Sequence, residues 1–146
     1  NKLYLEEIKM IDYNKILKEN SYGILATLDN NKPKTRILQY LFSEKNKVYL
    51  ATTNNKNVYK QLKKCPYVSF LSHSEDYLSF ISVNGNIHFT DDIDLKTRVL
   101  NEYPAIKELF KTPDNPIFEL FYINVEEIRT FDLKTYTNEN FKIEKP

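Results

Sequence analysis

The feature that most constrains the fold is a succession of six to eight short apolar runs, each bounded by a turn signal. These runs are rich in β-branched and aromatic residues, which favour strands. Most connections between them are too short for a crossover helix, so neighbouring strands are expected to be antiparallel. The expected strands span residues 22–28, 34–42, 48–52, 67–71, 78–89 and 117–125, with weaker strands at 128–133 and 141–143.

Helical patterns lie between or beside these strands, at the margins of the expected sheet. Asp12 is a suitable N-cap for the first helix, and Pro104 suits the first turn of the last one. The pattern favours a mainly β fold, an antiparallel β-barrel with peripheral helices, over a sandwich or an α/β sheet. We expect one domain over residues 1–146, with helices at about 12–20, 56–64, 91–101 and 104–110.

Composition excludes several functional classes. The 21 basic and 20 acidic residues nearly cancel, so neither a nucleic acid nor an anionic membrane is an expected partner. A single cysteine excludes an internal disulfide and is typical of the cytoplasm, and no membrane span or signal peptide is expected. With two distant histidines and no cysteine-rich spacing, we expect no metal site.

The stretch of residues 48–62 reads as a strand, a polar turn and a helix. We expect Thr53, Asn54 or Asn55 to cap the helix, whose first amides would then point back at the strand end. A helix start flanked by hydroxyl groups and Lys56 attracts an anion, most often phosphate. Taken alone, the stretch is more commonly an ordinary strand–helix junction with solvated lysines.

Arg36 is one of only three arginines and lies one strand before the threonines. If strands 34–42 and 48–52 pair as a hairpin, Arg36 lies near Thr52 and can share a phosphate with the helix start. The planar guanidinium suits that role better than an ammonium group does. The alternative is a surface ion pair with an acid such as Glu44.

A series of motifs extends this pattern along nearly the whole chain. It comprises residues 23–27, Pro33, Arg36, 48–52, 56–62, 66–68, 83–86, 91–92, 103–104, 114–116 and 118–121. The order and spacing resemble the pyridoxamine 5'-phosphate oxidase-like family of FMN-binding split barrels. The chain looks most like the short bacterial members, which include nitroimidazole-resistance and general stress proteins. The ordered series carries the resemblance, since no single motif in it is specific.

The resemblance implies a homodimer with FMN at each of two sites on the subunit interface. Segment 36–39 would line the flavin through backbone groups, and segment 51–53 would contact the ring edge and the phosphate. Lys56, with Asn57 or Lys60, would hold the phosphate. The implied cofactor-binding residues are Arg36, Ile37, Leu38, Gln39, Ala51, Thr52, Thr53, Lys56, Asn57, Lys60 and Phe80.

The sequence departs from the family pattern in two places. Phe80 and Ser82 occupy the positions where many relatives have a tryptophan and an arginine. Lys56-Asn57 occupies the position of the basic pair that often opens the phosphate-binding helix in relatives. The first departure bears on the substrate more than on flavin binding. The pocket is short of fixed positive charge, and the C-terminal segment after Arg129 contains no arginine. We therefore expect no authentic pyridoxamine 5'-phosphate oxidase activity.

The resemblance leaves two functional hypotheses. One is a flavin-dependent oxidoreductase that acts on a small molecule, with NADH or NADPH as a possible electron donor and no assignable catalytic residue. The other is a barrel that binds FMN, haem or a deazaflavin without turnover, as a store, sensor or stress-related protein. Both need the same phosphate site, so the sequence does not separate them.

Overall fold

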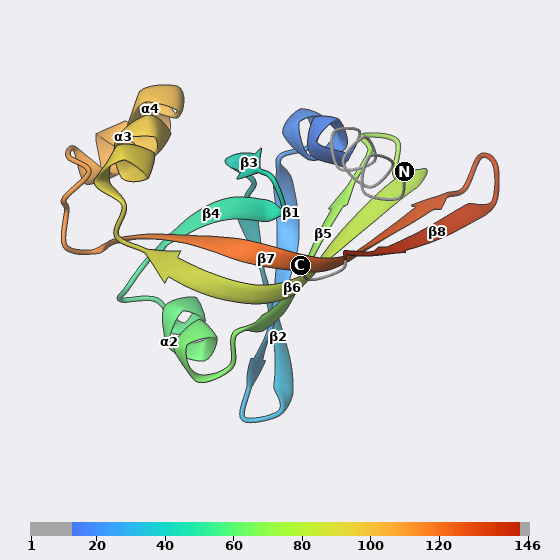
Figure 1. Cartoon of the computed structure of the whole chain (residues 1–146), viewed down its shortest axis with the longest axis horizontal. Coiled ribbons are helices and arrows are strands. Elements are labelled where there is room, and N and C mark those ends of the chain that lie inside the picture. Colours follow the sequence, from blue (N-terminus) through green and yellow to red (C-terminus); the bar gives the residue numbers. More distant parts are fainter. Residues whose placement is uncertain (1–12, 144–146) are drawn as a thin grey trace.

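Eight antiparallel strands form one curved sheet in the computed structural model, which describes residues 13–143 (Figure 1). The strands are β1 (Tyr22–Asp29), β2 (Lys32–Gln39), β3 (Phe42–Glu44), β4 (Lys47–Thr53), β5 (Tyr67–His73), β6 (Ser79–Thr90), β7 (Phe118–Asp132) and β8 (Thr137–Lys142). The helices are α2 (Asn57–Lys64), α3 (Ile93–Glu102) and α4 (Pro104–Phe110), and residues 13–19 are also helical. The expected mainly β barrel with peripheral helices is confirmed; Asp12 lies outside the described residues.

The sheet does not close on itself. Its strands pair in the order β2-β1-β5-β6-β7-β4-β3, and β8 pairs with β7. At one end, β2 pairs only with β1; at the other, β3 covers only Lys47–Tyr49 of β4. β2 and β4 approach each other without ladder pairing. We call this opening, between β2 and the second half of β4, the seam.

The prediction that residues 34–42 and 48–52 pair as a hairpin is wrong. The chain changes pairing partner between Tyr40 and Leu41. The Tyr40 N–H donates to the Ser21 carbonyl, whereas the Leu41 N–H donates to the Tyr49 carbonyl at 3.0 Å. The expected strand is therefore two strands, β2 and β3, which lie at opposite ends of the sheet order.

The two strands expected at 117–125 and 128–133 are one continuous strand, β7. The two expected strands are joined at a β-bulge. Asn84 pairs with Glu127 and Gly85 pairs with Val125, which leaves Glu126 without a partner on β6. Gly85 lies at this register shift, and a glycine within a strand is typical of a bulge or a close approach.

Two groups of buried apolar side chains form the core. The larger one fills the barrel, and its fully buried members include Leu25, Leu50, Phe70, Ile81 and Phe121. α2 adds Val58 and Leu62 to this group, since residues four apart lie on one face of a helix. The smaller group lies beneath α3 and α4 and contains Val99, Leu100, Phe110, Phe118 and Leu120.

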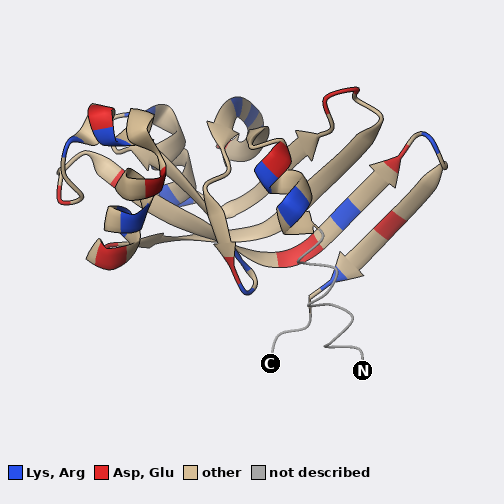
Figure 2. Ribbon diagram, turned by 90° about the horizontal axis from the view of Figure 1, so that it is seen from above, with Lys and Arg blue, Asp and Glu red and all other residues tan. Residues whose placement is uncertain are grey.

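Charged residues lie mostly on the helices, the turns and the β7–β8 hairpin (Figure 2). β5 and β6 contain no Lys, Arg, Asp or Glu at all. Among the described residues, no helix has both the length and the apolar character needed to cross a membrane.

Candidate functional site

α2 begins without a capping side chain. Its N-cap is Lys56, and no side-chain hydrogen bond caps the helix. The expected caps are used elsewhere: the Thr53 hydroxyl donates to Asn55 Oδ1 at 2.6 Å, and the Asn54 amide donates to the Pro116 carbonyl at 2.7 Å. The capping expectation is therefore wrong. The first backbone N–H groups of α2 have no side-chain acceptor within the described chain.

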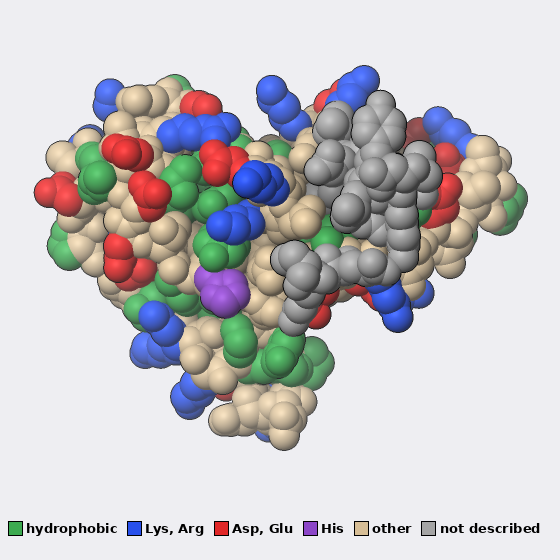
Figure 3. Space-filling model, in the orientation of Figure 1, with side chains coloured by type: hydrophobic (Ala, Val, Ile, Leu, Met, Phe, Trp, Pro, Cys, Tyr) green, Lys and Arg blue, Asp and Glu red, His purple; other side chains and the backbone are tan. Residues whose placement is uncertain are grey.

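Positive charge collects at this end of α2. The side chains of Lys56 and Lys60 are exposed and form no ion pair with another described residue, and the first turn contains no acid. Figure 3 shows basic side chains over α2. Cations at a helix N-terminus oppose the helix dipole by about 0.3–1 kcal/mol each. Lys63 differs, because its ammonium lies 4.7 Å from the centre of the Phe89 ring.

The Thr52 hydroxyl is a second polar group near the start of α2 that lacks a hydrogen-bond partner among the described residues. Its oxygen is buried. A buried polar atom left unpaired costs about 1–3 kcal/mol. Thr52 is the second-to-last residue of β4, so this hydroxyl lies just before the turn that leads into α2.

The seam leaves backbone groups available on both of its sides. β2 is an edge strand, so half of the N–H and C=O groups of Arg36–Gln39 point away from β1. Ala51–Thr53 pair with β7 on one side and have no strand on the other. Ile37 is 68% exposed, whereas Leu38 packs against the core. Two expected binding segments thus border one opening.

Arg36 is not placed by a hairpin with β4; it reaches across β1 to α2. Its Nη1 donates to Thr27 Oγ1 at 2.7 Å and to the Leu25 carbonyl at 3.1 Å, and its Nη2 donates to Gln61 Oε1 at 2.5 Å. Partial burial lowers the pKa of its guanidinium. The alternative ion pair with Glu44 does not form, because Glu44 pairs with Arg98 instead.

Phe80 lies away from the other expected site residues. It pairs with Phe131 near the end of β7, whereas Thr53 pairs with Phe118 at the start of β7. It helps to line an open cavity of about 280 Å³, together with Ser82, Arg129, Thr130, Phe131 and Asn138. One chain therefore brings together the segments around α2 and the seam, but not Phe80.

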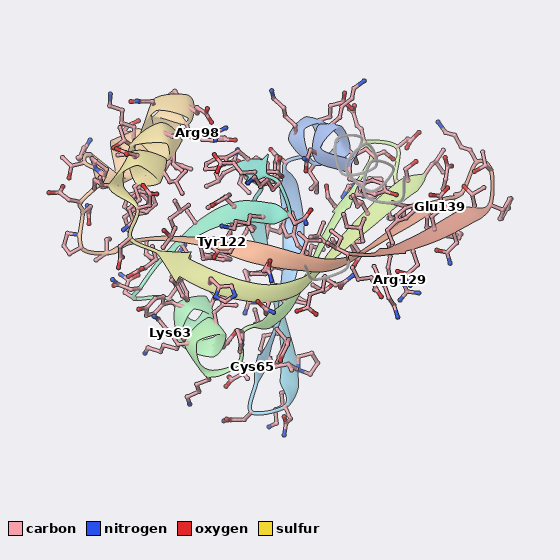
Figure 4. All side chains as sticks on the ribbon, viewed as in Figure 1. Lys63, Cys65, Arg98, Tyr122, Arg129 and Glu139 are labelled. Atoms are coloured by element: carbon pink, nitrogen blue, oxygen red, sulfur yellow. The ribbon has the colours of Figure 1, made fainter. Side chains whose placement is uncertain are left out.

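Arg129 is a residue that the sequence reasoning missed. It pairs directly with Ser82, so the cavity does contain a cation at the place where one was expected to be missing. Figure 4 shows Arg129 on the β7–β8 extension, well away from Lys63 on α2. Its rarity was a signal, since the chain has only three arginines, but its strand partner was not readable from the sequence.

The donors around α2 fit a phosphate group. Backbone amides without acceptors, unpaired lysines and a buried hydroxyl offer donors and positive charge, and the first turn has no carboxylate to compete. Helix N-termini of this kind bind phosphates and sulfates. Among the described residues, no group of His, Cys, Asp and Glu could hold a metal ion.

A family model matches most of the chain. The model of the pyridoxamine 5'-phosphate oxidase family matches residues 11–132, which is most of the chain. The chain therefore belongs to the pyridoxamine 5'-phosphate oxidase-like family, as the sequence resemblance indicated. No curated protein matches the chain closely enough to show a relationship.

Several solved structures share the fold over most of their length. A NimC/NimA family protein from Clostridium acetobutylicum is 25% identical, with a TM-score of 0.81 over 92% of this chain and 94% of that one. General Stress Protein 26 from Bacillus anthracis str. Sterne is 22% identical, with a TM-score of 0.74 over 88% and 94%. A pyridoxamine 5'-phosphate oxidase-related, FMN-binding protein from Nostoc punctiforme PCC 73102 is 15% identical, with a TM-score of 0.62 over 94% of each chain.

Proposed function

We propose that this protein binds FMN, with the phosphate at the start of α2 and the ring along the seam, and acts as an oxidoreductase on a small molecule. One observation carries the proposal: the uncapped end of α2 gathers Lys56, Lys60 and the nearby Arg36, with no acid in its first turn. A phosphate dianion accepts from the free amides and relieves the repulsion among these cations. Membership of a family with FMN-binding members supports FMN as the source of that phosphate.

The chain's own residues divide the work of binding. Lys56, Asn57 and Lys60 hold the phosphate, and the Thr52 hydroxyl gains the partner that it lacks. Backbone groups of Arg36–Gln39 and Ala51–Thr53 face the two sides of the ring. Bound FMN supplies hydride or electron transfer, with NADH or NADPH as the proposed donor.

The proposed site lies between two copies of the chain. Ile24 pairs with both Ile37 and Leu71, and these three side chains are 40%, 68% and 37% exposed. They form an apolar row across β2, β1 and β5, next to the uncharged strand β6. Covering this row in a homodimer removes apolar surface from water. In such a dimer, Phe80 of one protomer approaches the FMN bound by the other.

The first test is the cofactor that the purified protein carries. We expect a yellow protein that releases FMN on denaturation, identified by mass spectrometry. The second stage is anaerobic reduction of the bound flavin by NADH or NADPH, followed by reoxidation with candidate acceptors. A protein that binds no flavin after reconstitution with excess FMN contradicts the proposal, whereas bound FMN that is never reduced leaves a binding role without turnover.

A further inference from the structure

Three polar side chains from separate elements form one network beneath α2. Arg36 of β2 donates to Thr27 of β1 and to Gln61 of α2. The Thr27 hydroxyl in turn donates to Gln61 Oε1 at 2.7 Å. Thr27 is 2% exposed and Gln61 is 8% exposed, so both neutral members are buried.

This network places a positive charge beside α2. Gln61 follows Asn57 by one helical turn, and helical side chains lean toward the N-terminus of their helix. This lean directs Gln61 Oε1, and the guanidinium that donates to it at 2.5 Å, toward the end of α2 where the amides are free. Its partners are all neutral oxygens, and it forms no ion pair with a described carboxylate.

A purely structural role does not account for this arrangement. Val58 and Leu62 already anchor α2 to the barrel core by apolar burial. A hydrogen bond between Thr27 and Gln61 alone would join β1 to α2 without burying a charge. An arginine without an acid, beside the positive end of a helix, is electrostatically unfavourable until an anion arrives.

We propose that Thr27 and Gln61 are positioning residues for the phosphate site: they fix the Arg36 guanidinium and the axis of α2, and so set the preference for a phosphorylated flavin. Neither residue has to touch the phosphate. Thr27 orients the guanidinium from below, and Gln61 ties the same group to the helix whose amides bind the anion. This inference rests on the proposed FMN site and assigns its selectivity to residues outside it.

The test compares FMN with riboflavin, which lacks the phosphate, in titrations of apoprotein variants. Thr27→Val removes the hydroxyl with little change of shape, and Thr27→Ser is its matched control. Gln61→Met removes the acceptor at similar length. We expect Thr27→Val and Gln61→Met to weaken FMN about tenfold or more, as the loss of a hydrogen bond to a charged group does. Riboflavin affinity should stay within about twofold, and Thr27→Ser should keep the wild-type ratio.

The outcomes separate this inference from the proposed function. A wild-type protein that binds neither flavin contradicts the proposed function. A wild-type protein that prefers FMN, with variants that keep the full preference, overturns only the positioning role; equal losses of both flavins overturn it as well. If circular dichroism shows that the buried variants do not fold, FMN and riboflavin affinities are compared in Arg36→Lys instead, because Arg36 is only partly buried. This variant keeps the positive charge but loses the planar guanidinium that Thr27 and Gln61 hold in place.

Discussion

Gly85 of β6 lies so close to Asn124 of β7 that no side chain fits between them. A Cβ atom built on Gly85 would lie 2.1 Å from the Asn124 carbonyl oxygen, which is far inside any contact distance. The obstacle is backbone and cannot rotate away. This contact sits at the bulge where β6 and β7 shift register, so the bulge depends on glycine at this position.

Gly85→Ala should therefore destabilise the protein by about 1–3 kcal/mol, as overpacking of a filled site does. The free energy of unfolding is measured by urea denaturation monitored by circular dichroism. Asn140→Ala, on the exposed strand β8, is the control and should change stability by no more than about 0.5 kcal/mol. Equal stability of Gly85→Ala and wild type would contradict the close approach.

Local signals in the sequence predicted the starts of α3 and α4, although the cap expected for α2 was wrong. The helix expected at about residues 91–101 is α3, and the carboxylate of its N-cap, Asp92, accepts from the backbone N–H groups of Asp94 and Leu95. Pro104 begins α4 as expected. These features depend on residues a few positions apart, so their chemistry is present in the sequence itself.

Pairings between distant segments were harder to predict. The hairpin error arose because the Tyr40 N–H donates to Ser21, just before β1, whereas the Leu41 N–H donates to Tyr49 of β4, and no local motif marks that change of partner. The network of Arg36 with Thr27 and Gln61 joins three elements, and its geometry appears only when β1 lies beneath α2. The sequence therefore indicated which segments to consider for the proposed site, whereas the contacts among them could not be predicted.

The proposed phosphate site predicts a difference between two flavins. Lys56→Ala and Lys60→Ala should each weaken FMN by about 1.5–3 kcal/mol if a charge-assisted hydrogen bond is lost, with a much smaller effect on riboflavin. Fluorescence titration of the apoprotein measures both affinities. Lys107→Ala, on the exposed side of α4, is the control for a general loss of charge. Equal losses for the two flavins would place these lysines away from the phosphate.

The apolar row predicts a dimer that a single charge disrupts. Leu71→Glu puts a carboxylate into the row formed with Ile24 and Ile37, and burying an unpaired charge in an interface is costly. We expect a monomer by light scattering at micromolar concentration, with FMN binding strongly reduced. Leu109→Glu, on the 65% exposed Leu109 of α4, should leave the dimer intact. A monomeric wild-type protein that still holds FMN would contradict the shared site.

The cavity around Phe80 bears on substrate choice and supplies the last prediction. Its described lining offers one guanidinium, Arg129, beside Ser82, and no second cation. A substrate phosphate is a dianion, and removing it from water is costly when only one cation compensates its charge. We therefore expect FMN-loaded protein under oxygen to form no pyridoxal 5'-phosphate at an enzymatic rate from pyridoxine 5'-phosphate or pyridoxamine 5'-phosphate. The low end of enzymatic rates is about 1 per second.

Product formation in this assay is followed by the absorbance of pyridoxal 5'-phosphate, with the flavin content of each sample measured first. Arg129→Ala is the informative variant if turnover is seen, because it removes the one cation that lines the cavity. Turnover at about 1 per second or faster would refute the prediction. Loss of that turnover in Arg129→Ala, with FMN still bound, would then identify Arg129 as the group that one substrate phosphate needs, since the Ser82 hydroxyl opposite it carries no charge.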